Sequence, residues 1–207
     1  DVREGPGSLL HMQDAVVSLA AIVGASACDR DKAAATTTNY FAIVELCGCL
    51  SQNQILIYPN TNSGYGIGGE ALCTEETPMR PVSLYGTTKV NAEHRVLEHR
   101  LGVSLRFATL FGMSPRMRLD LLVNDFVYRA IHDRALVLFE ARFRRNFLHV
   151  RDAALAIVHA LEHADVMGGQ AYNAGLSSAN LTKIELCERI REQINTFTWV
   201  EAPVGQD

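Results

Sequence analysis

Short apolar runs alternate with stretches of helical spacing through the first half of the chain. The apolar runs cover residues 14–21, 55–58 and 103–110, and each resembles a strand that is buried on both faces of a parallel sheet. Helical spacing covers residues 38–50 and 84–100, between those runs. This order predicts right-handed βαβ units and therefore an α/β fold with a parallel sheet.

The second half of the chain has a less regular pattern. Helical spacing recurs over residues 121–135 and 150–162, and residues 147–150 and 170–174 are candidates for short strands. We therefore expect a smaller lobe of mixed helices and strands that packs on the sheet.

The border between the two parts is predicted at Gly112-Met113-Ser114-Pro115, because glycine and proline interrupt the chain just after the last strong strand. This border predicts one domain over residues 1–112 and a smaller lobe over residues 113–207.

Composition and charge narrow the choice of partners. Of the 207 residues, 48% are hydrophobic and 20% are charged, and the formal net charge is −4 with acidic and basic residues interspersed. This pattern disfavours nucleic acid and membrane surfaces as partners and favours a small-molecule ligand. No apolar run approaches the roughly 20 residues that span a bilayer, and the acidic start does not resemble a signal peptide. We expect a soluble, cytoplasmic protein.

Cysteines and histidines do not form a metal-binding pattern. The five cysteines are scattered without a Cys-x-x-Cys pair, which indicates neither a disulfide framework nor a zinc site. His159 and His163 are four residues apart on an expected helix, but no third ligand stands at a suitable spacing. No metal site is therefore predicted.

Tyr85 and Lys89 stand four residues apart at the start of an expected helix, so that both side chains lie on one face. A phenol has an ordinary pKa of about 10 and needs a nearby cation to act as a base at neutral pH. Lys89 can supply that cation. The alternative reading of the lone spacing is an ordinary exposed helix face.

The strand before this helix ends in a polar, small-residue segment, Pro59-Asn60-Thr61-Asn62-Ser63-Gly64-Tyr65-Gly66. Ligands of open α/β sheets bind at the carboxyl ends of strands, so this segment is a candidate site. A hydroxyl residue four before a Tyr-Gly pair, an acidic-proline loop at Glu76-Thr77-Pro78 and the Tyr-x-x-x-Lys spacing together resemble extended short-chain dehydrogenases/reductases of the nucleotide-sugar epimerase type.

The resemblance implies a Rossmann-like doubly wound parallel sheet, with residues 1–112 as a partial dinucleotide-binding domain and residues 113–207 as a mainly substrate-binding lobe. It implies that Thr61, Tyr85 and Lys89 are the catalytic trio. NAD is the implied cofactor, with NADP left open, and the residues that match the family's cofactor-binding positions are Asp1, Val2, Leu19, Ala20, Ala21, Asn39, Tyr85, Lys89 and Phe107.

The resemblance also implies a nucleotide-diphosphate sugar as the substrate. Arg145 matches the arginine of the family's substrate-lobe signature, and a planar guanidinium pairs bidentately with phosphate oxygens. Ser63, Thr109 and Asn124 are further candidates for substrate contact, although Asn124 equally fits a helix-surface amide. Arg142 and Arg144 are expected to be solvated loop charges. Tyr65 is open to substrate contact or to a packing role, which is common for a tyrosine next to glycine at a strand end, and Ser63 is favoured over it as the substrate contact.

The glycine-rich turn that receives a dinucleotide pyrophosphate is not found in this sequence, because no Gly-x-x-Gly-x-x-Gly occurs and Gly5-Pro6-Gly7 has neither the spacing nor a preceding strand. Without the strands that normally precede it, the strand over residues 15–21 would be left as a bare sheet edge. We therefore expect this sequence to be part of a longer protein, or something else to cover that edge. We also expect a C-terminal tail that stops early, and weak binding of NAD if the missing part is absent.

The function that these residues predict is an NAD-dependent nucleotide-sugar epimerase that oxidises a sugar hydroxyl transiently to a ketone. A reductase, dehydrogenase or sugar-nucleotide decarboxylase of the same family is the alternative within the class, and a non-catalytic cofactor-binding protein or inactive fragment is the alternative outside it. Dehydration is disfavoured, because Asn62 and Ser63 stand where a dehydratase carries carboxylates. A homodimer is expected from the resemblance.

Overall fold

The computed structural model describes residues 1–5, 7–67 and 72–203. Pro6 of the Gly-Pro-Gly segment and residues 204–207 of the expected C-terminal tail lie outside the described residues. The chain divides into two compact units. The first contains Asp1–Phe107 and Leu155–Ala174, and the second contains Ala108–Ala154 and the residues from Gly175 onward.

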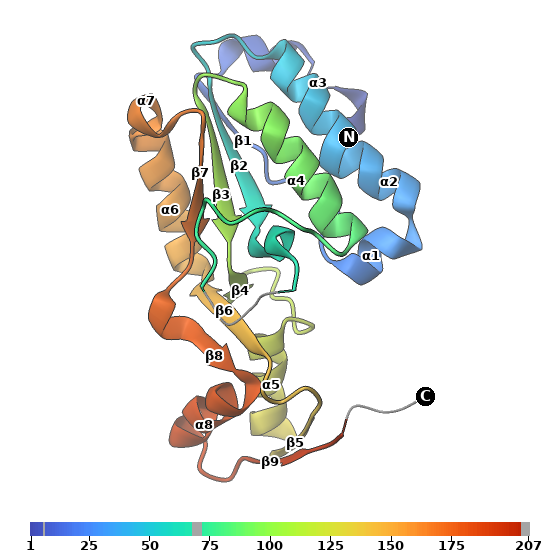
Figure 1. Cartoon of the computed structure of the whole chain (residues 1–207), viewed down its shortest axis with the longest axis vertical. Coiled ribbons are helices and arrows are strands. Elements are labelled where there is room, and N and C mark those ends of the chain that lie inside the picture. Colours follow the sequence, from blue (N-terminus) through green and yellow to red (C-terminus); the bar gives the residue numbers. More distant parts are fainter. Residues whose placement is uncertain (6, 68–71, 204–207) are drawn as a thin grey trace. The chain divides into compact units, whose positions relative to one another are not determined.

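The first unit is built around a sheet of four parallel strands in the order β1-β2-β3-β7 (Figure 1). These strands are β1 (Ala15–Val17), β2 (Ile55–Thr61), β3 (Gly102–Phe107) and β7 (Gln170–Ala174). The parallel sheet confirms the predicted α/β class. In β3 all six residues are buried, as expected for a strand covered on both faces.

The edge strand β1 is much shorter than the run predicted over residues 14–21. Its last ladder bond runs from the Ser18 N–H to the Ile57 carbonyl at 3.0 Å, so the odd-numbered residues of β2 face β1. The next residue on that side is Pro59, which has no N–H to donate. The pairing therefore ends at Val17, and the chain leaves the sheet.

Helices pack on this sheet. The helix α4 (Leu84–Leu97) lies against β2 and β3, with α3 (Ala42–Cys49) beside it. The core between them contains Leu56, Tyr58, Ala92 and Val96, all nearly inaccessible to solvent. The remaining helical segments of the unit are η1 (Val2–Glu4), η2 (Ser8–Met12), α1 (Ala25–Arg30), α2 (Lys32–Thr36), η3 (Thr37–Phe41), η4 (Asn62–Tyr65), most of α6 (Val150–Glu162) and α7 (Ala164–Met167).

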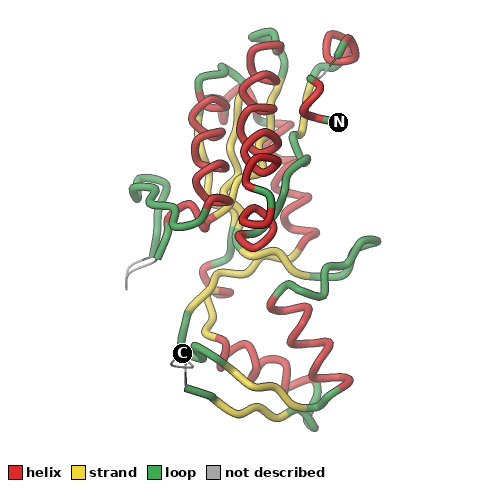
Figure 2. Tube along the Cα trace, turned by 90° about the vertical axis from the view of Figure 1, so that its right-hand side faces the viewer, coloured by secondary structure: helices red, strands yellow, loops and turns green. Residues whose placement is uncertain are grey.

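The second unit is a mixed α/β body with its own core. Its strands are β4 (Thr109–Phe111), β5 (Ala135–Leu138), β6 (Arg144–His149), β8 (Asn180–Thr182) and β9 (Thr198–Glu201). Its other helical elements are α5 (Leu122–His132), η5 (Ser177–Ala179) and α8 (Lys183–Gln193). The strands form two small sheets, β4-β6-β8 and β5-β9, which Figure 2 shows as yellow segments beside the helices. Phe126, Leu138, Phe147 and Phe197 are among the residues that fill the core.

The border differs from the single point predicted at residues 112–115. The strand β7 pairs in parallel with β3, Val103 opposite Gln170 and Phe107 opposite Ala174, so residues 155–174 belong to the first unit. The sequence of a five-residue strand does not show which sheet the strand joins. The return of residues 155–174 to the first unit depends on the pairing of β7 with β3.

Candidate active site

Thr61 lies at the carboxyl end of β2, where a ligand site is expected in a parallel sheet. Its hydroxyl accepts the Ser63 N–H at 3.2 Å and caps the short helix η4, and it lies 2.9 Å from the Ser63 hydroxyl. The two predicted site residues Thr61 and Ser63 are therefore in direct contact.

The Tyr-Gly pair that follows has a structural reason for its glycine. Gly66 has a φ of 80°, a conformation that side chains disfavour. A Cβ at this position would lie 2.1 Å from the Arg80 carbonyl oxygen. The chain thus turns tightly after Tyr65, and the loop that contains Arg80 closes against the turn.

Tyr85 and Lys89 both lie on the first two turns of α4. The helix begins at Ser83, whose hydroxyl accepts the Gly86 N–H at 3.1 Å as an N-cap. Tyr85 is half-buried and Lys89 is buried, with 4% of its surface exposed. This arrangement agrees with the predicted common helix face and excludes an ordinary exposed face for Lys89.

The ammonium group of Lys89 lies over the ring of Tyr58, with Nζ 3.9 Å from the ring centroid. The Tyr58 hydroxyl donates to the Lys89 carbonyl oxygen at 3.4 Å. Burial lowers the pKa of Lys89 to about 7, while the Glu93 carboxylate acts in the opposite direction. Burial, and then Tyr85, raise the pKa of Tyr58 well above its usual value. Tyr58 therefore stays neutral and contacts the ammonium group through the face of its ring.

A buried carboxylate lies one turn beyond Lys89. Glu93 is 1% exposed and accepts hydrogen bonds from the Asn60 amide at 2.7 Å, the Ser104 hydroxyl at 2.6 Å and the Arg106 guanidinium at 2.7 Å. Burial acts to raise its pKa, but these hydrogen bonds outweigh burial and the pKa of Glu93 is lowered. Glu93 is therefore an ionised group inside the unit.

Arg106 extends the network to the turn after β2. One guanidinium nitrogen donates to the Tyr65 hydroxyl at 2.8 Å and to the Glu75 carbonyl oxygen at 3.1 Å. Tyr65 in turn donates to the Asn173 side chain at 2.6 Å. Tyr65 is buried, and both hydrogen bonds of its hydroxyl lie within this network. Tyr58, Glu93 and Arg106 are not among the residues that the sequence predicts for the site. The four-residue spacing from Lys89 to Glu93 is the one sequence signal for any of them.

Asn39 is 1% exposed and lies on a π-helical turn, η3, of a kind often found at functional sites. Its side-chain oxygen accepts the Ile22 N–H at 2.8 Å, and its amide nitrogen donates to the Ile22 carbonyl oxygen at 2.9 Å. Asn39 therefore clamps the loop that follows β1, and its polar atoms serve that loop.

The other predicted cofactor residues fall into three places. Leu19 and Ala20 are exposed and Ala21 is half-buried, on the loop that Asn39 clamps. Phe107 is buried at the end of β3, opposite Thr61. Asp1 is exposed and caps η1 by accepting the Arg3 N–H at 3.0 Å, with Val2 next to it.

Three predicted substrate residues lie in the second unit. Thr109 is half-buried on β4 opposite Phe147, and Arg145 is exposed on β6. Asn124 is 5% exposed, so its reading as a helix-surface amide is wrong. Its amide oxygen accepts the Gly112 N–H at 3.0 Å, and its nitrogen donates to the Arg118 carbonyl oxygen at 2.9 Å, which holds a loop.

Arg144 is not the solvated loop charge that the sequence predicted. It lies on β6, where its guanidinium donates to the Asn180 carbonyl oxygen at 2.6 Å and to the Glu185 carboxylate at 2.9 Å. Glu185 also forms a capping box with Thr182 at the start of α8. Arg144 is exposed like Arg145, but its guanidinium fastens β6 to β8 and α8.

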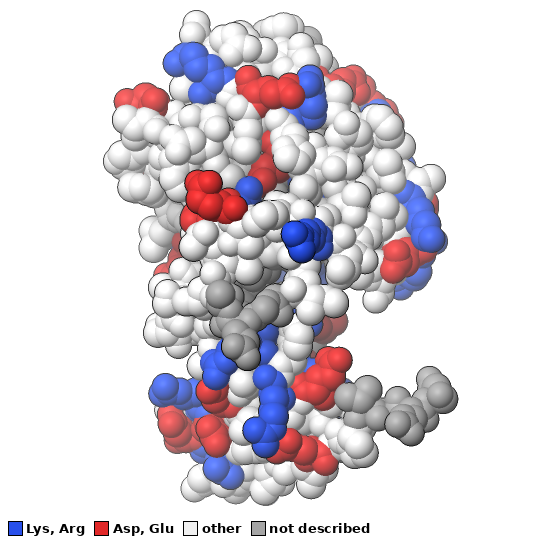
Figure 3. Space-filling model, viewed as in Figure 1, with Lys and Arg blue, Asp and Glu red and all other residues white. Residues whose placement is uncertain are grey.

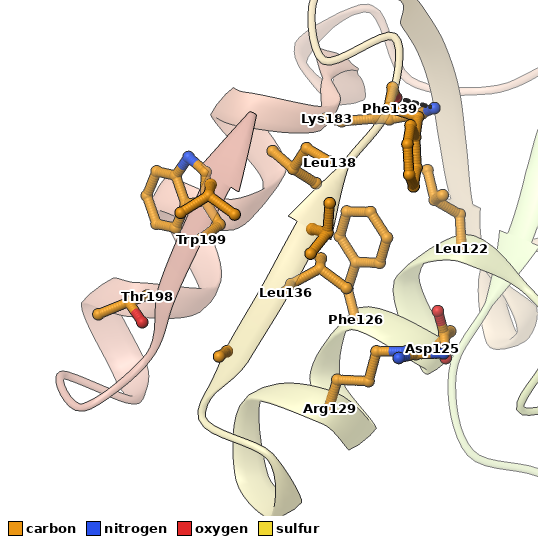
Figure 4. A pocket seen from close by; sticks show the side chains of 13 residues that line it. Leu122, Asp125, Phe126, Arg129, Leu136, Leu138, Phe139, Lys183, Thr198 and Trp199 are labelled. Atoms are coloured by element: carbon orange, nitrogen blue, oxygen red, sulfur yellow. Dashed lines mark hydrogen bonds and ion pairs between the residues drawn. The ribbon is translucent and has the colours of Figure 1, made fainter. Parts of the chain in front are cut away.

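A pocket of about 500 Å³ lies within the second unit (Figure 4). It is formed by one face of α5 and by the strands β5 and β9, and its lining includes Phe126, Phe139 and Trp199. Two cations border it: Arg129 pairs with Asp125 at 2.9 Å, and Lys183 donates to the Phe139 carbonyl oxygen at 2.6 Å. None of the predicted substrate residues lines this pocket.

Two general features accompany these sites. On the face that Figure 3 shows, basic and acidic side chains are intermingled. In the described ranges, no helix has the length and apolar character needed to cross a membrane.

The parallel α/β sheet belongs to a class of fold that many enzymes share, and the comparison with known families names the family. The model of the NAD dependent epimerase/dehydratase family matches residues 8–175. The chain belongs to this family.

The similar proteins include both epimerases and a dehydratase. An uncharacterized UDP-glucose epimerase of Bacillus subtilis, YtcB, is 26% identical over 96% of this chain, and the match spans 65% of that protein. The UDP-glucuronic acid 4-epimerase of Bacillus cereus, solved with UDP-glucuronic acid and NAD, has a TM-score of 0.79 at 24% identity, over 99% of this chain and 65% of that one.

A dTDP-glucose 4,6-dehydratase of Bacillus anthracis, solved with NAD, has a TM-score of 0.79 at 24% identity, over 100% of this chain and 67% of that chain. The chain thus spans about two thirds of the length of these proteins. At this identity the solved structures establish the Rossmann-type fold, in agreement with the predicted doubly wound sheet.

Proposed function

We propose that this protein is an NAD-dependent nucleotide-sugar epimerase. The observation that carries the proposal is the buried Lys89 on the same helix face as Tyr85, in the unit where Thr61 ends β2. A buried ammonium costs folding free energy, so its presence beside a tyrosine needs a chemical reason. Stabilising a phenolate is such a reason.

The residues of the first unit suit a nicotinamide dinucleotide. The loop after β1 is clamped by Asn39 and presents the small side chains of Ala20 and Ala21 at the carboxyl end of the sheet, where the backbone can approach a flat ligand closely. Leu19, Phe107, Asp1 and Val2 are the other residues that we propose for this ligand. When bound, NAD accepts a hydride from a sugar carbon and returns it.

The side chains of this chain supply the proton chemistry. Tyr85, as a phenolate, removes the proton from the sugar hydroxyl, and the Thr61 hydroxyl donates a hydrogen bond to the same oxygen. Lys89 stabilises the phenolate by its charge. If the ketone turns within the site so that the hydride would return to the opposite face of its carbon, Tyr85 gives the proton back to the oxygen, and the reaction consumes no net oxidant.

We propose that the pocket of the second unit takes the nucleotide base. Its volume lies in the range of small-molecule sites, and Phe139 and Trp199, the less buried aromatic residues of its lining, offer stacking surfaces. We propose further that Arg145 binds the diphosphate, because its guanidinium is exposed whereas that of Arg144 is paired.

The pocket predicts a fluorescence response. Trp199 is the single tryptophan of the chain and lines the pocket, so titration with UDP should change its emission. Val137→Asp, which places a carboxylate in the lining, should raise the dissociation constant about tenfold. Val166→Asp is the matched control, because Val166 is equally an exposed valine but lies on α7 in the first unit. Equal affinity of the two variants for UDP would refute the assignment of the pocket.

Product analysis tests the reaction itself. The purified protein, given NAD and UDP-glucose or UDP-glucuronic acid in deuterated water, should form an epimer of unchanged mass without net formation of NADH. A dehydratase would lose one water and incorporate solvent deuterium, and a dehydrogenase, reductase or decarboxylase would change the redox state of the nicotinamide. Asn62 and Ser63, in place of carboxylates after Thr61, favour the first outcome.

Tyr85→Phe is the matched variant for this assay, since it removes only the phenol oxygen. It should abolish turnover while UDP still changes the emission of Trp199. A Tyr85→Phe protein with full activity would exclude Tyr85 as the base, and no reaction in the unaltered protein with either sugar nucleotide would favour a non-catalytic role.

A further inference from the structure

Tyr85, Lys89 and Glu93 occupy successive turns of one face of α4, each four residues from the next. The pair Tyr85 and Lys89 has a role in the proposed reaction, whereas Glu93 has none. Glu93 is nevertheless the most completely buried acid among the described residues, at 1% exposure.

The carboxylate of Glu93 is held in one position by three donors from two strands. Asn60 on β2 donates at 2.7 Å, and Ser104 and Arg106 on β3 donate at 2.6 Å and 2.7 Å. Asn60 also accepts the Thr61 N–H at 2.8 Å. The carboxylate is thus fixed between the strand end that carries Thr61 and the helix that carries Lys89.

The surroundings of Lys89 contain few groups that could supply its counter-charge. From β2 the neutral ring of Tyr58 faces the ammonium. On α4 itself Tyr85 lies one turn before it and Glu93 one turn after it. From β3 the cation Arg106 pairs with Glu93. On α1 burial raises the pKa of Cys28, and its neutral thiol donates a hydrogen bond to the Ile22 carbonyl oxygen. Glu93 is the negative charge that acts on Lys89.

We propose that Glu93 is a positioning residue that acts through Lys89, by keeping the ammonium form of this lysine in a site whose burial opposes it. The inference rests on the proposed function, because it gives Lys89 a reason to be charged. A merely structural carboxylate would tie β2, β3 and α4 together without any effect on the protonation of Lys89.

A double-mutant cycle measured by urea unfolding separates these two roles without NAD or sugar. Lys89→Met is made in the natural protein and in Glu93→Gln, and the stability gain from Lys89→Met is compared in the two backgrounds. At about pH 9 the gains should be equal, because folded Lys89 is then mostly neutral in both. At about pH 5.5 the factor by which Lys89→Met raises the folding equilibrium constant should be about tenfold larger in Glu93→Gln than in the natural protein, because Lys89 then lacks the charge that favours its ammonium form.

Two further variants keep the test decisive. If Glu93→Gln does not fold, the cycle is run in the charge-free pair Glu93→Gln/Arg106→Met, in which no buried charge is left alone. Ser104→Ala removes one hydrogen bond from Glu93 but no charge, and should leave the gain unchanged. A gain at about pH 5.5 that is the same in Glu93→Gln as in the natural protein would overturn the proposal. Absence of turnover in the product assay would refute the proposed function and leave the cycle unaffected.

Discussion

Replacing Lys89 by methionine should make the folded chain more stable at pH 7 by about 3 kcal/mol, although it removes a residue of the candidate active site. The reason is that burial lowers the pKa of Lys89 to about 7, whereas an unfolded lysine keeps a pKa near 10.5. Methionine fills a similar volume and carries no charge to desolvate. The loss of the contact with the Tyr58 ring offsets part of the gain.

The sign of the pH dependence follows from the lowered pKa. Between about pH 7 and 10.5 the unfolded chain binds a proton that the folded chain does not, so the stability of the natural protein rises with pH across this window. The advantage of Lys89→Met should therefore shrink by about half between pH 7 and about pH 9. Urea unfolding followed by circular dichroism at the two pH values measures it.

Lys32→Met is the matched control for this prediction. Lys32 is exposed on α2 and shows no burial of its charge, so the substitution should change the free energy of unfolding by less than about 0.5 kcal/mol at either pH. A Lys89→Met protein less stable than the natural protein at pH 7 would contradict the account of Lys89 as a desolvated cation.

Replacing Arg106 by methionine should lower the free energy of unfolding by about 3 to 5 kcal/mol at pH 7, because the ionised and buried Glu93 would lose its ion-pair partner. This loss is a large part of the 5 to 15 kcal/mol that typically holds a domain together. Arg95→Met is the control, since Arg95 pairs with Glu98 on the exposed side of the same helix, where a salt bridge is worth about 1 kcal/mol or less.

The pH dependence identifies the cause of the Arg106 effect. In the natural protein the hydrogen bonds of Glu93 lower its pKa, so its stabilising contribution is present above the unfolded pKa and is lost as the pH falls. Without Arg106, burial dominates and raises the pKa of Glu93, so the carboxyl group is neutralised in mild acid. The deficit of Arg106→Met should shrink from pH 7 to about pH 5. A deficit that stays constant over this range would attribute the loss to packing.

The fold was predictable where the pattern is local. Residues 170–174 and 150–162 are predicted with the bounds that β7 and α6 have, and the helical period of α6 is visible in its own sequence. The length of β1 was not predictable, since it depends on Pro59 in the neighbouring strand. The helix α8 was missed although Thr182 and Glu185 carry the spacing of a capping box.

The residues of the candidate site likewise divide into those that a local sequence pattern indicates and those that only the folded chain shows. Thr61, Tyr85 and Lys89 stand in short segments with recognisable spacing, so the sequence indicated them together. The roles of Asn39, Asn124 and Arg144 depend on backbone atoms or side chains distant in the sequence, and only the folded chain shows what each binds. Glu93 and Arg106 are thirteen residues apart and meet only because α4 packs on β3. No local pattern encodes such a pair.

The position of Trp199 allows the two units to be followed by different optical signals, tryptophan emission and circular dichroism. Its emission reports the second unit alone, because the chain has one tryptophan and Trp199 packs beside Phe197 in that unit. Most of the helical signal in circular dichroism comes from segments of the first unit. Substitutions at Lys89 or Arg106 therefore move the tryptophan transition only to the extent that the two units unfold as one cooperative body, and a single pair of denaturation curves measures that thermodynamic coupling.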